Sequence, residues 1–373
     1  MRRRLTIAIL LTASVGALGA FSVFAASTST TIRGGDDITV RCDGSKLNSV
    51  KIDARTFKLT CVASATATLT ATATRTPTPS PTPTTTPPPG SGTMLAGCPV
   101  FPANNAWNQD VRSLPVHPNS ANYVASINAF GRTKLHPDFG SDPTYGIPFV
   151  IVPATQPTVP IAFTAYGDES DPGPYPVPAN APVEGGANST GDRHVLVLRQ
   201  GECKLYEMFR AFPNGSGWNA DAGAVFDLNS NALRPDYWTS TDAAGLPVLP
   251  GLVRYDEVMA GVITHALRFT VSHTQRGFIH PATHFASSST DANYPPMGLR
   301  LRLRADFDTS AYTGASRVVL EALKKYGMIV ADNGSDWFIT GATDSRWNDT
   351  DLGQLKNVPG SAFEVVDTGP IIR

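Results

Sequence analysis

The sequence predicts an all-β dominated protein, a β-sandwich of jelly-roll or lectin/glucanase type with a few short helices. Strand-like runs dominate the chain beyond residue 96, and several alternate apolar and polar residues as half-buried strands do. The connections are rich in Pro, Gly, Asn and Asp, which is typical of antiparallel sheets with long loops. Strands do not alternate regularly with helices, which argues against a Rossmann or TIM architecture. The runs span residues 146–153, 161–166, 193–200, 203–212, 265–273, 297–305, 328–332, 336–341 and 363–367.

The N-terminus has the organisation of a secretory signal peptide. Arg2, Arg3 and Arg4 precede an uncharged apolar run that ends at Phe24, and two alanines follow it. Because many residues of the run are small, we expect cleavage, secretion and no membrane contact afterwards. The alternative is an uncleaved anchor, since the run approaches the roughly 20 residues needed to cross a bilayer.

A low-complexity segment and four cysteines divide the chain. Residues 64–92 alternate Thr with Ala and then with Pro, which is typical of an extended spacer that buries no core. The cysteine number is even and no Cys-x-x-Cys occurs, as expected in an oxidising compartment. With the spacer between the second and third cysteine, we predict the bridges Cys42–Cys61 and Cys98–Cys203. The predicted parts are a signal peptide (1–26), a small disulfide-bonded β module (29–62), a disordered linker (63–95) and a β-sandwich domain (96–373).

Two hairpins and one helix are predicted within the large domain. Residues 193–209 predict a hairpin that turns at Gln200-Gly201, and residues 328–341 predict one that turns at Asn333-Gly334. Residues 314–326 predict a helix, because apolar residues form a stripe along one face. Two lysines in its last turn and Gly327 directly after it are a typical helix ending.

Several stretches of the large domain resemble a widespread group of uncharacterised secreted bacterial proteins. They are "YGIPFVIVP", "GDRHVLVL", "HALRFTV", "PPMGLRLRL" and "ALKKYGMIVADNGSDWFI". The resemblance covers nearly all of residues 96–373, and it implies no assigned reaction and no catalytic residue. The small module and its Thr-Pro spacer are similar to the front ends of extracellular proteins of some filamentous bacteria, many of which carry polysaccharide-degrading domains.

Four of the seven histidines lie between His265 and His284. If residues 265–273 form a strand, His265 and His273 end its apolar face, whereas Arg268 lies on the polar face. Eight residues of strand separate these two histidines by about 26 Å, so they cannot bind one metal ion. His280 and His284 have a weak His-x-x-x-His metal spacing, and zinc would need a third ligand such as His194 or Glu207.

Glu207 is the favoured catalytic carboxyl. It shares a strand face with Leu205 and Phe209, and apolar surroundings raise a carboxyl pKa, as a proton donor to a glycosidic oxygen requires. The alternative is a structural ion pair with Arg193 or Arg268. A loop after the 265–273 strand is expected to bring His280 or His284 to the same cleft. The predicted catalytic residues are Glu207, Asp192, His194, His280 and His284, with Arg268, Trp218 and Trp238 contacting substrate. Asp192, Asp227 and Asp236 are the alternatives for a second carboxylate.

An acidic loop and a row of arginines each have a structural and a functional interpretation. Asp168, Glu169 and Asp171 form an acidic loop that could hold structural calcium, although the sequence favours a solvated loop, because the full ligand pattern of a calcium loop is missing. Arg300, Arg302 and Arg304 share one strand face. That face is either an exposed outer surface or a groove for an acidic glycan. We predict no cofactor and no metal in the site.

These observations favour a secreted glycoside hydrolase that acts on an extracellular polysaccharide by carboxylate acid/base catalysis. The alternatives are a non-catalytic glycan-binding or cell-surface protein and a polysaccharide lyase. The formal net charge of −1 argues against binding to nucleic acid. The expected partner is a polysaccharide or a cell-surface glycan, and we expect a monomer.

Overall fold

The computed structural model describes residues 5–7, 38–40, 45–51, 57–63 and 93–373. The chain divides into two compact units, Met1–Thr82 and Pro83–Arg373. The predicted linker to residue 92, most of the signal peptide and Cys42, on which the predicted Cys42–Cys61 bridge depends, lie outside the described residues. Within the described part of the chain, no helix combines the length and apolar character needed to cross a membrane.

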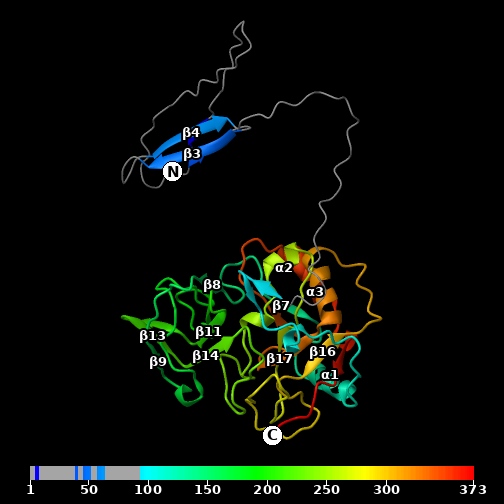
Figure 1. Cartoon of the computed structure of the whole chain (residues 1–373). Helices are drawn as coiled ribbons and strands as arrows, with labels where there is room; N and C mark the ends of the chain where they lie inside the picture. Colours follow the sequence, from blue (N-terminus) through cyan, green and yellow to red (C-terminus); the bar gives the residue numbers. More distant parts are fainter. Residues whose placement is uncertain (1–4, 8–37, 41–44, 52–56, 64–92) are drawn as a thin grey trace, which may run out of the picture. The chain divides into compact units, whose positions relative to one another are not determined.

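The first unit contains two pairs of strands (Figure 1). β1 (Leu5–Ile7) pairs in parallel with β2 (Ile38–Val40). β3 (Ser45–Lys51) pairs antiparallel with β4 (Phe57–Ala63), with Ser45 opposite Ala63 and Lys51 opposite Phe57.

The second unit confirms the predicted strand-rich class with a few short helices. It contains a six-stranded sheet of order β19-β16-β17-β15-β18-β7, a four-stranded sheet β14-β11-β10-β8 and a three-stranded sheet β12-β13-β9. In Figure 1, β9, β11, β13 and β14 gather in one half of the unit, and β7, β16 and β17 lie with the helices in the other. The strands are β5 (Met94–Leu95), β6 (Cys98–Pro99), β7 (His136–Asp138), β8 (Phe149–Val152), β9 (Ile161–Phe163), β10 (Val195–Arg199), β11 (Lys204–Phe209), β12 (Phe212–Asn214), β13 (Gly217–Ala220), β14 (Ala222–Asp227), β15 (Leu267–Val271), β16 (Arg300–Leu303), β17 (Met328–Asn333), β18 (Phe338–Thr340) and β19 (Phe363–Val366).

The helices are short and lie mainly with the six-stranded sheet. Helix α3 begins at Gly314 and ends at Lys325, which confirms the predicted helix, and its stripe residues Val319, Leu320 and Leu323 are fully buried. Gly327 follows with φ +69°, the left-handed conformation that a helix ending favours. The others are α1 (Ser120–Ala129), α2 (Tyr255–Met259), α4 (Asp349–Leu352) and the 3₁₀ helices η1 (Ala106–Asn108), η2 (Gly167–Glu169), η3 (Leu249–Gly251), η4 (Gly353–Asn357) and η5 (Gly360–Ala362).

The sheets are mixed, so the expectation of purely antiparallel pairing is wrong. β8 pairs in parallel with β10, β9 with β13, β15 with β17, and β7 with β18. Parallel neighbours require crossover connections, which the long irregular segments between the strands supply. Alternation along a strand reports which face is buried and carries no information on the direction of the neighbouring strand.

One predicted hairpin is confirmed and the other is wrong. β10 and β11 pair antiparallel, with Leu196 opposite Glu207. β17 and β18, in contrast, do not pair, because β15 lies between them and pairs with both. The turn at Asn333-Gly334 therefore joins two strands that flank a third. Trp337, fully buried with φ +65°, lies in this connection.

Two hydrophobic cores lie on opposite faces of the four-stranded sheet. One face contributes Leu196, Leu198 and Leu205 to the main core, which Leu267 and Phe269 of the six-stranded sheet and helix α3 complete. The other face contributes Val195, Val197, Tyr206 and Met208 to a second core shared with Trp218 of the three-stranded sheet. The predicted Cys98–Cys203 bridge is confirmed, and it joins the entry of the unit to the turn before β11.

Candidate active site

A polar cavity of about 320 Å³ lies against one face of the six-stranded sheet. Its floor is the face of β15 opposite the buried Leu267, Phe269 and Val271, as alternation along this strand predicts. Arg268 on β15 donates from Nη1 to Thr340 Oγ1 of β18 at 3.0 Å, and Thr340 pairs with Asp138 of β7. Four adjacent strands thus supply the floor residues Asp138, Arg268, Thr270, Asp332, Phe338 and Thr340.

A β-bulge places Asp332 in this cavity. Phe269 of β15 lies opposite Val330, but the next residue, Thr270, lies opposite Asp332, so β17 contains one extra residue at this point. Without the bulge, Ala331 would oppose Thr270, and Asp332 would turn toward the core face that carries Phe269. Bulges of this kind often re-aim a side chain beside a functional site. Burial raises the pKa of the Asp332 carboxyl.

The wall opposite the floor carries Glu184, Asp192 and His194. His194 Nδ1 lies 2.6 Å from Glu184 Oε2, and its Nε2 lies 2.8 Å from the Thr241 carbonyl oxygen. Burial alone would lower the pKa of His194, but the Glu184 carboxylate and the Thr241 carbonyl raise it to about 9. Burial likewise opposes the charged form of Glu184, yet His194 lowers the pKa of this carboxyl below its ordinary value. The pair is therefore an imidazolium–carboxylate contact at neutral pH.

Glu207 does not line the cavity, and its carboxylate contacts the segment that carries Thr241, Val248 and Leu249. Its Oε2 accepts hydrogen bonds from Thr241 Oγ1 and the Val248 N–H, both at 2.9 Å, and its Oε1 accepts from the Leu249 N–H at 2.9 Å. The side chain is fully buried, and burial raises its pKa against the opposing effect of these donors. Glu207 therefore anchors the 239–249 segment, and both of its oxygens are engaged inside the protein.

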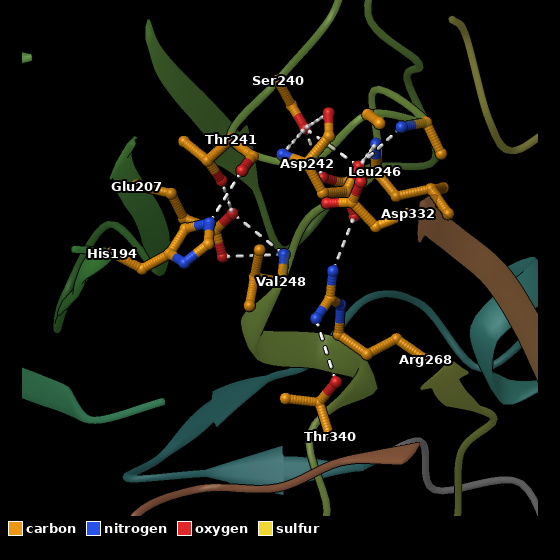
Figure 2. Close-up of polar contacts among 12 residues, drawn as sticks. His194, Glu207, Ser240, Thr241, Asp242, Leu246, Val248, Arg268, Asp332 and Thr340 are labelled. Carbon is orange, nitrogen blue, oxygen red and sulfur yellow. Dashed lines mark hydrogen bonds and ion pairs between the residues drawn. The ribbon is translucent and has the colours of Figure 1, made fainter. Parts of the chain in front are cut away.

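The same segment carries a second buried carboxyl, Asp242 (Figure 2). Its Oδ1 accepts from the Ala244 and Leu246 N–H groups at 3.0 Å. Its Oδ2 lies 3.6 Å from Arg268 Nη2 and has no hydrogen-bond partner among the residues that the structure describes. Figure 2 shows Asp332 beside Asp242, with Arg268 reaching toward them from the floor. Burial raises the pKa of Asp242 to about 7, although Arg268 opposes the rise.

The structure brings together only part of the predicted site. Asp192, His194 and Arg268 line the cavity, whereas Glu207 does not, and Thr241 contacts both Glu207 and His194. The assignment of Glu207 as proton donor is therefore revised, because a carboxylate saturated by internal donors cannot contact substrate. Sequence reasoning missed Asp138, Glu184, Asp242 and Asp332. No pattern in the sequence marks the bulge that turns Asp332 toward the cavity, and none marks the path of the irregular loop that carries Glu184.

The predicted histidines of the 265–284 stretch lie elsewhere. His280 is exposed and its Nε2 contacts Asp236 Oδ1 at 2.8 Å, while His284 Nδ1 contacts the Ala243 carbonyl oxygen at 2.8 Å. Neither lines the cavity. His265 is fully buried between Glu257 and the Ala266 carbonyl oxygen, and His273 is exposed. The core strand therefore carries one satisfied buried histidine and one surface histidine at its two ends.

The predicted aromatic contacts also lie outside this cavity. Trp218 is buried in the second core, and Trp238 is partly buried with the Arg234 guanidinium over its ring. Of the alternatives for a second carboxylate, Asp236 contacts His280, and Asp227, the last residue of β14, is not among the residues that line the cavity.

The proposed calcium loop is occupied by internal contacts. Asp171 forms an ion pair with Arg234 and accepts from the Val225 N–H, and Glu169 accepts from the Thr239 N–H. Among the residues that the structure describes, no three His, Cys, Asp or Glu side chains are arranged so that they could hold a metal ion.

The arginine face of β16 is used inside the protein. Arg300 is buried and donates to the backbone oxygens of Tyr326, Ala106 and Gln109. Arg302 donates to Glu364, and both it and Arg300 lie under neighbouring segments. The interpretation of this face as an exposed surface or a groove for an acidic glycan is therefore wrong for its two inner arginines, because irregular segments cover it.

Comparison of the chain with protein-family models, with curated proteins and with solved structures found no match.

Proposed function

We propose that this protein is a secreted glycoside hydrolase acting on an extracellular polysaccharide, with Asp332 as proton donor and Glu184 as the second carboxylate. The observation that carries the proposal is the pairing of these two carboxyls in one polar cavity, in surroundings that move their pKa values in opposite directions. Such pairs identify acid and base roles in hydrolases.

Asp332 has the surroundings that a proton donor needs. It is partly buried at the cavity floor beside Asp242, and two neighbouring carboxyls disfavour simultaneous ionisation. Asp332 would donate its proton to the glycosidic oxygen as the bond from that oxygen to the sugar carbon breaks. Arg268 lies between the two carboxyls and Thr340, where it fixes the position of the floor.

Glu184, in contrast to Asp332, is held in its charged form. Both of its contacts with His194 use Oε2, from the imidazole Nδ1 and from the backbone N–H, so Oε1 is the oxygen that can face the cavity. A carboxylate held charged in this way either activates the attacking water or attacks the sugar carbon directly. His194 is then a positioning residue. This positioning role replaces the predicted one, in which His194 was a catalytic residue.

The structure also bears on the two alternative functions, a polysaccharide lyase and a non-catalytic glycan-binding protein. The two inner arginines of the β16 face, which would suit the acidic substrate of a polysaccharide lyase, donate to backbone oxygens inside the protein and are not presented to a substrate. A lectin-like protein would use the same cavity without turnover. Secretion is supported by the N-terminal pattern and by the Cys98–Cys203 bridge, since disulfides persist in oxidising compartments.

The test compares the wild type with Asp332→Asn and Glu184→Gln on a panel of soluble polysaccharides, with reducing-end release as the readout. Each variant should lose about 10²–10⁴-fold in kcat while its unfolding temperature stays near that of the wild type. Asp306→Asn, at an exposed aspartate outside the cavity, is the matched control and should keep full activity. Full activity in Asp332→Asn would refute the assignment, and a wild type that binds glycan without cleaving any would identify a lectin.

A further inference from the structure

Asp242 has a buried carboxylate oxygen that no donor reaches. The residue is 4% exposed, and its Oδ1 accepts from the Ala244 and Leu246 N–H groups at 3.0 Å. Its Oδ2 has no hydrogen-bond partner in the described part of the chain, because Arg268 Nη2 lies 3.6 Å away, beyond hydrogen-bond distance. Buried polar atoms are nearly always hydrogen-bonded in native proteins, so this oxygen calls for a donor.

Asp332 is the neighbour that can supply this donor. The Ala244 N–H donates to the Ala331 carbonyl oxygen at 3.1 Å, which fixes the Asp242 segment to β17 directly before Asp332. Figure 2 shows the two carboxyls side by side, and the charge of Asp332 contributes to the raised pKa of Asp242. Asp332 Oδ1 accepts from the Asn333 N–H at 2.7 Å, so a proton on this carboxyl belongs on Oδ2.

The charged groups that face the two carboxyls favour a single negative charge between them. Arg268 of β15 lowers the pKa of both, His194 of β10 lowers that of Asp332, and Glu207 of β11 raises that of Asp242. His194 already has a carboxylate partner, so Arg268 is the cation that remains to balance the pair. Two adjacent buried carboxyls beside one guanidinium hold one proton in common. The other acidic residues that line the cavity are Asp138, Glu184 and Asp192.

We propose that Asp242 and Asp332 share one proton in a hydrogen bond between their carboxyl groups, and that Asp242 is the positioning residue which holds this proton at the cavity floor. The shared proton does not depend on the proposed function, whereas its part in the reaction rests on it. There the O–H bond of Asp332 breaks as the proton passes to the glycosidic oxygen, and the bond from that oxygen to the sugar carbon breaks with it. Arg268 then faces two carboxylates until the proton released by the attacking water returns to the pair through solvent.

Replacing Asp242 with Asn separates the shared proton from the structural role of this residue. The amide oxygen of Asn can still accept from the Ala244 and Leu246 N–H groups, so the turn keeps its contacts. The amide N–H groups then point toward Asp332, and they stabilise its carboxylate form. The pKa of Asp332 should therefore fall, and a proton donor with a lower pKa loses its proton, and its activity, at a lower pH.

The first test needs no activity. The aspartate Cγ atoms of the full chain are labelled with ¹³C, and their NMR signals are followed across the pH range. In the wild type, two signals should titrate together, with one step well above the ordinary aspartate pKa of about 4. In Asp242→Asn the signal of Asp332 should titrate lower by about one pH unit or more. Asp332→Asn is the reciprocal variant, which leaves the Asp242 turn intact and should lower the pKa of Asp242.

The second test is the pH profile of kcat/KM on the polysaccharide panel. In Asp242→Asn the decline toward high pH should begin lower by about one pH unit or more. Ser240→Ala is the matched control on the same segment, because it removes the hydrogen bonds of Ser240 Oγ with the Leu246 oxygen and the Asp242 N–H and leaves both carboxyls in place. It should lower the unfolding temperature without moving the titration or the pH profile.

The outcomes separate the shared proton from the proposed reaction. Independent titration of Asp242 and Asp332 in the wild type, or an unchanged pKa of Asp332 in Asp242→Asn, overturns the shared proton and leaves the hydrolase assignment to its own test. A coupled titration that disappears in both variants supports the shared proton even if the wild type cleaves no polymer, which would remove only the reaction. A shifted titration with an unchanged pH profile overturns the part of the pair in catalysis.

Discussion

Replacing Glu207 with Gln tests whether this carboxyl is structural. Glu207 accepts hydrogen bonds from the Thr241 hydroxyl and from the Val248 and Leu249 N–H groups, and it donates none. The amide of Gln would place two N–H donors where one of the carboxylate oxygens now accepts. Because the Val248 N–H lies within 3.0 Å of both oxygens, either orientation of the amide opposes a donor to a donor.

The expected loss of stability follows from these contacts. Hydrogen bonds to a charged group contribute about 1.5–3 kcal/mol each, and a buried donor left unsatisfied costs about 1–3 kcal/mol. Loss of one charged contact together with one unsatisfied donor therefore predicts a decrease of about 3–5 kcal/mol in the free energy of unfolding. For a unit of this size the unfolding temperature should fall by roughly 6–10 °C.

Calorimetry of Glu207→Gln measures this fall, with Glu202→Gln as the control on the same hairpin. Glu202 is half exposed, so its substitution should change the free energy of unfolding by less than about 0.5 kcal/mol. Below its unfolding temperature, Glu207→Gln should keep most of its activity. The reasoning would be refuted if the unfolding temperature fell by less than about 2 °C while kcat fell a hundredfold. That result would mean that Glu207 is protonated and acts as the acid, since the amide of Gln can replace a protonated carboxyl in the fold but cannot donate its proton to substrate.

Three further predictions concern stability. Folding raises the pKa of His194 from 6.5 to about 9, so its contribution to the free energy of unfolding is complete below pH 6.5 and is lost as the pH rises through about 9. The unfolding temperature of the wild type should therefore fall over this pH range, and that of His194→Gln should not show this fall. Replacing Cys98 and Cys203 with Ser, which opens a span of 105 residues, should cost up to about 5 kcal/mol in chemical denaturation. A Cβ at Gly245 would lie 2.2 Å from a threonine hydroxyl, so Gly245→Ala should destabilise clearly more than Gly186→Ala, where φ is also positive but space is open; equal costs would contradict the steric argument.

Local pattern was sufficient to predict several features that the structure confirms. Alternation along residues 265–273 placed Phe269 in the core and Arg268 on the opposite face, which became the cavity floor. The apolar stripe and the lysines before Gly327 located helix α3. The position of the spacer among the cysteines predicted the Cys98–Cys203 bridge. Each of these features depends on residues close in sequence or on the order of the modules.

The composition of the site was decided by tertiary structure. Asp332 faces the cavity because a bulge shifts β17 by one residue, and a sequence period carries no signal for such a shift. Glu184 and Asp242 come from irregular segments without any period. Glu207 followed the predicted face, but the backbone N–H groups of residues 248 and 249 occupy its carboxylate. Periodicity determines which face of a strand a side chain takes, whereas long-range strand order and the paths of loops determine which side chains share a cavity.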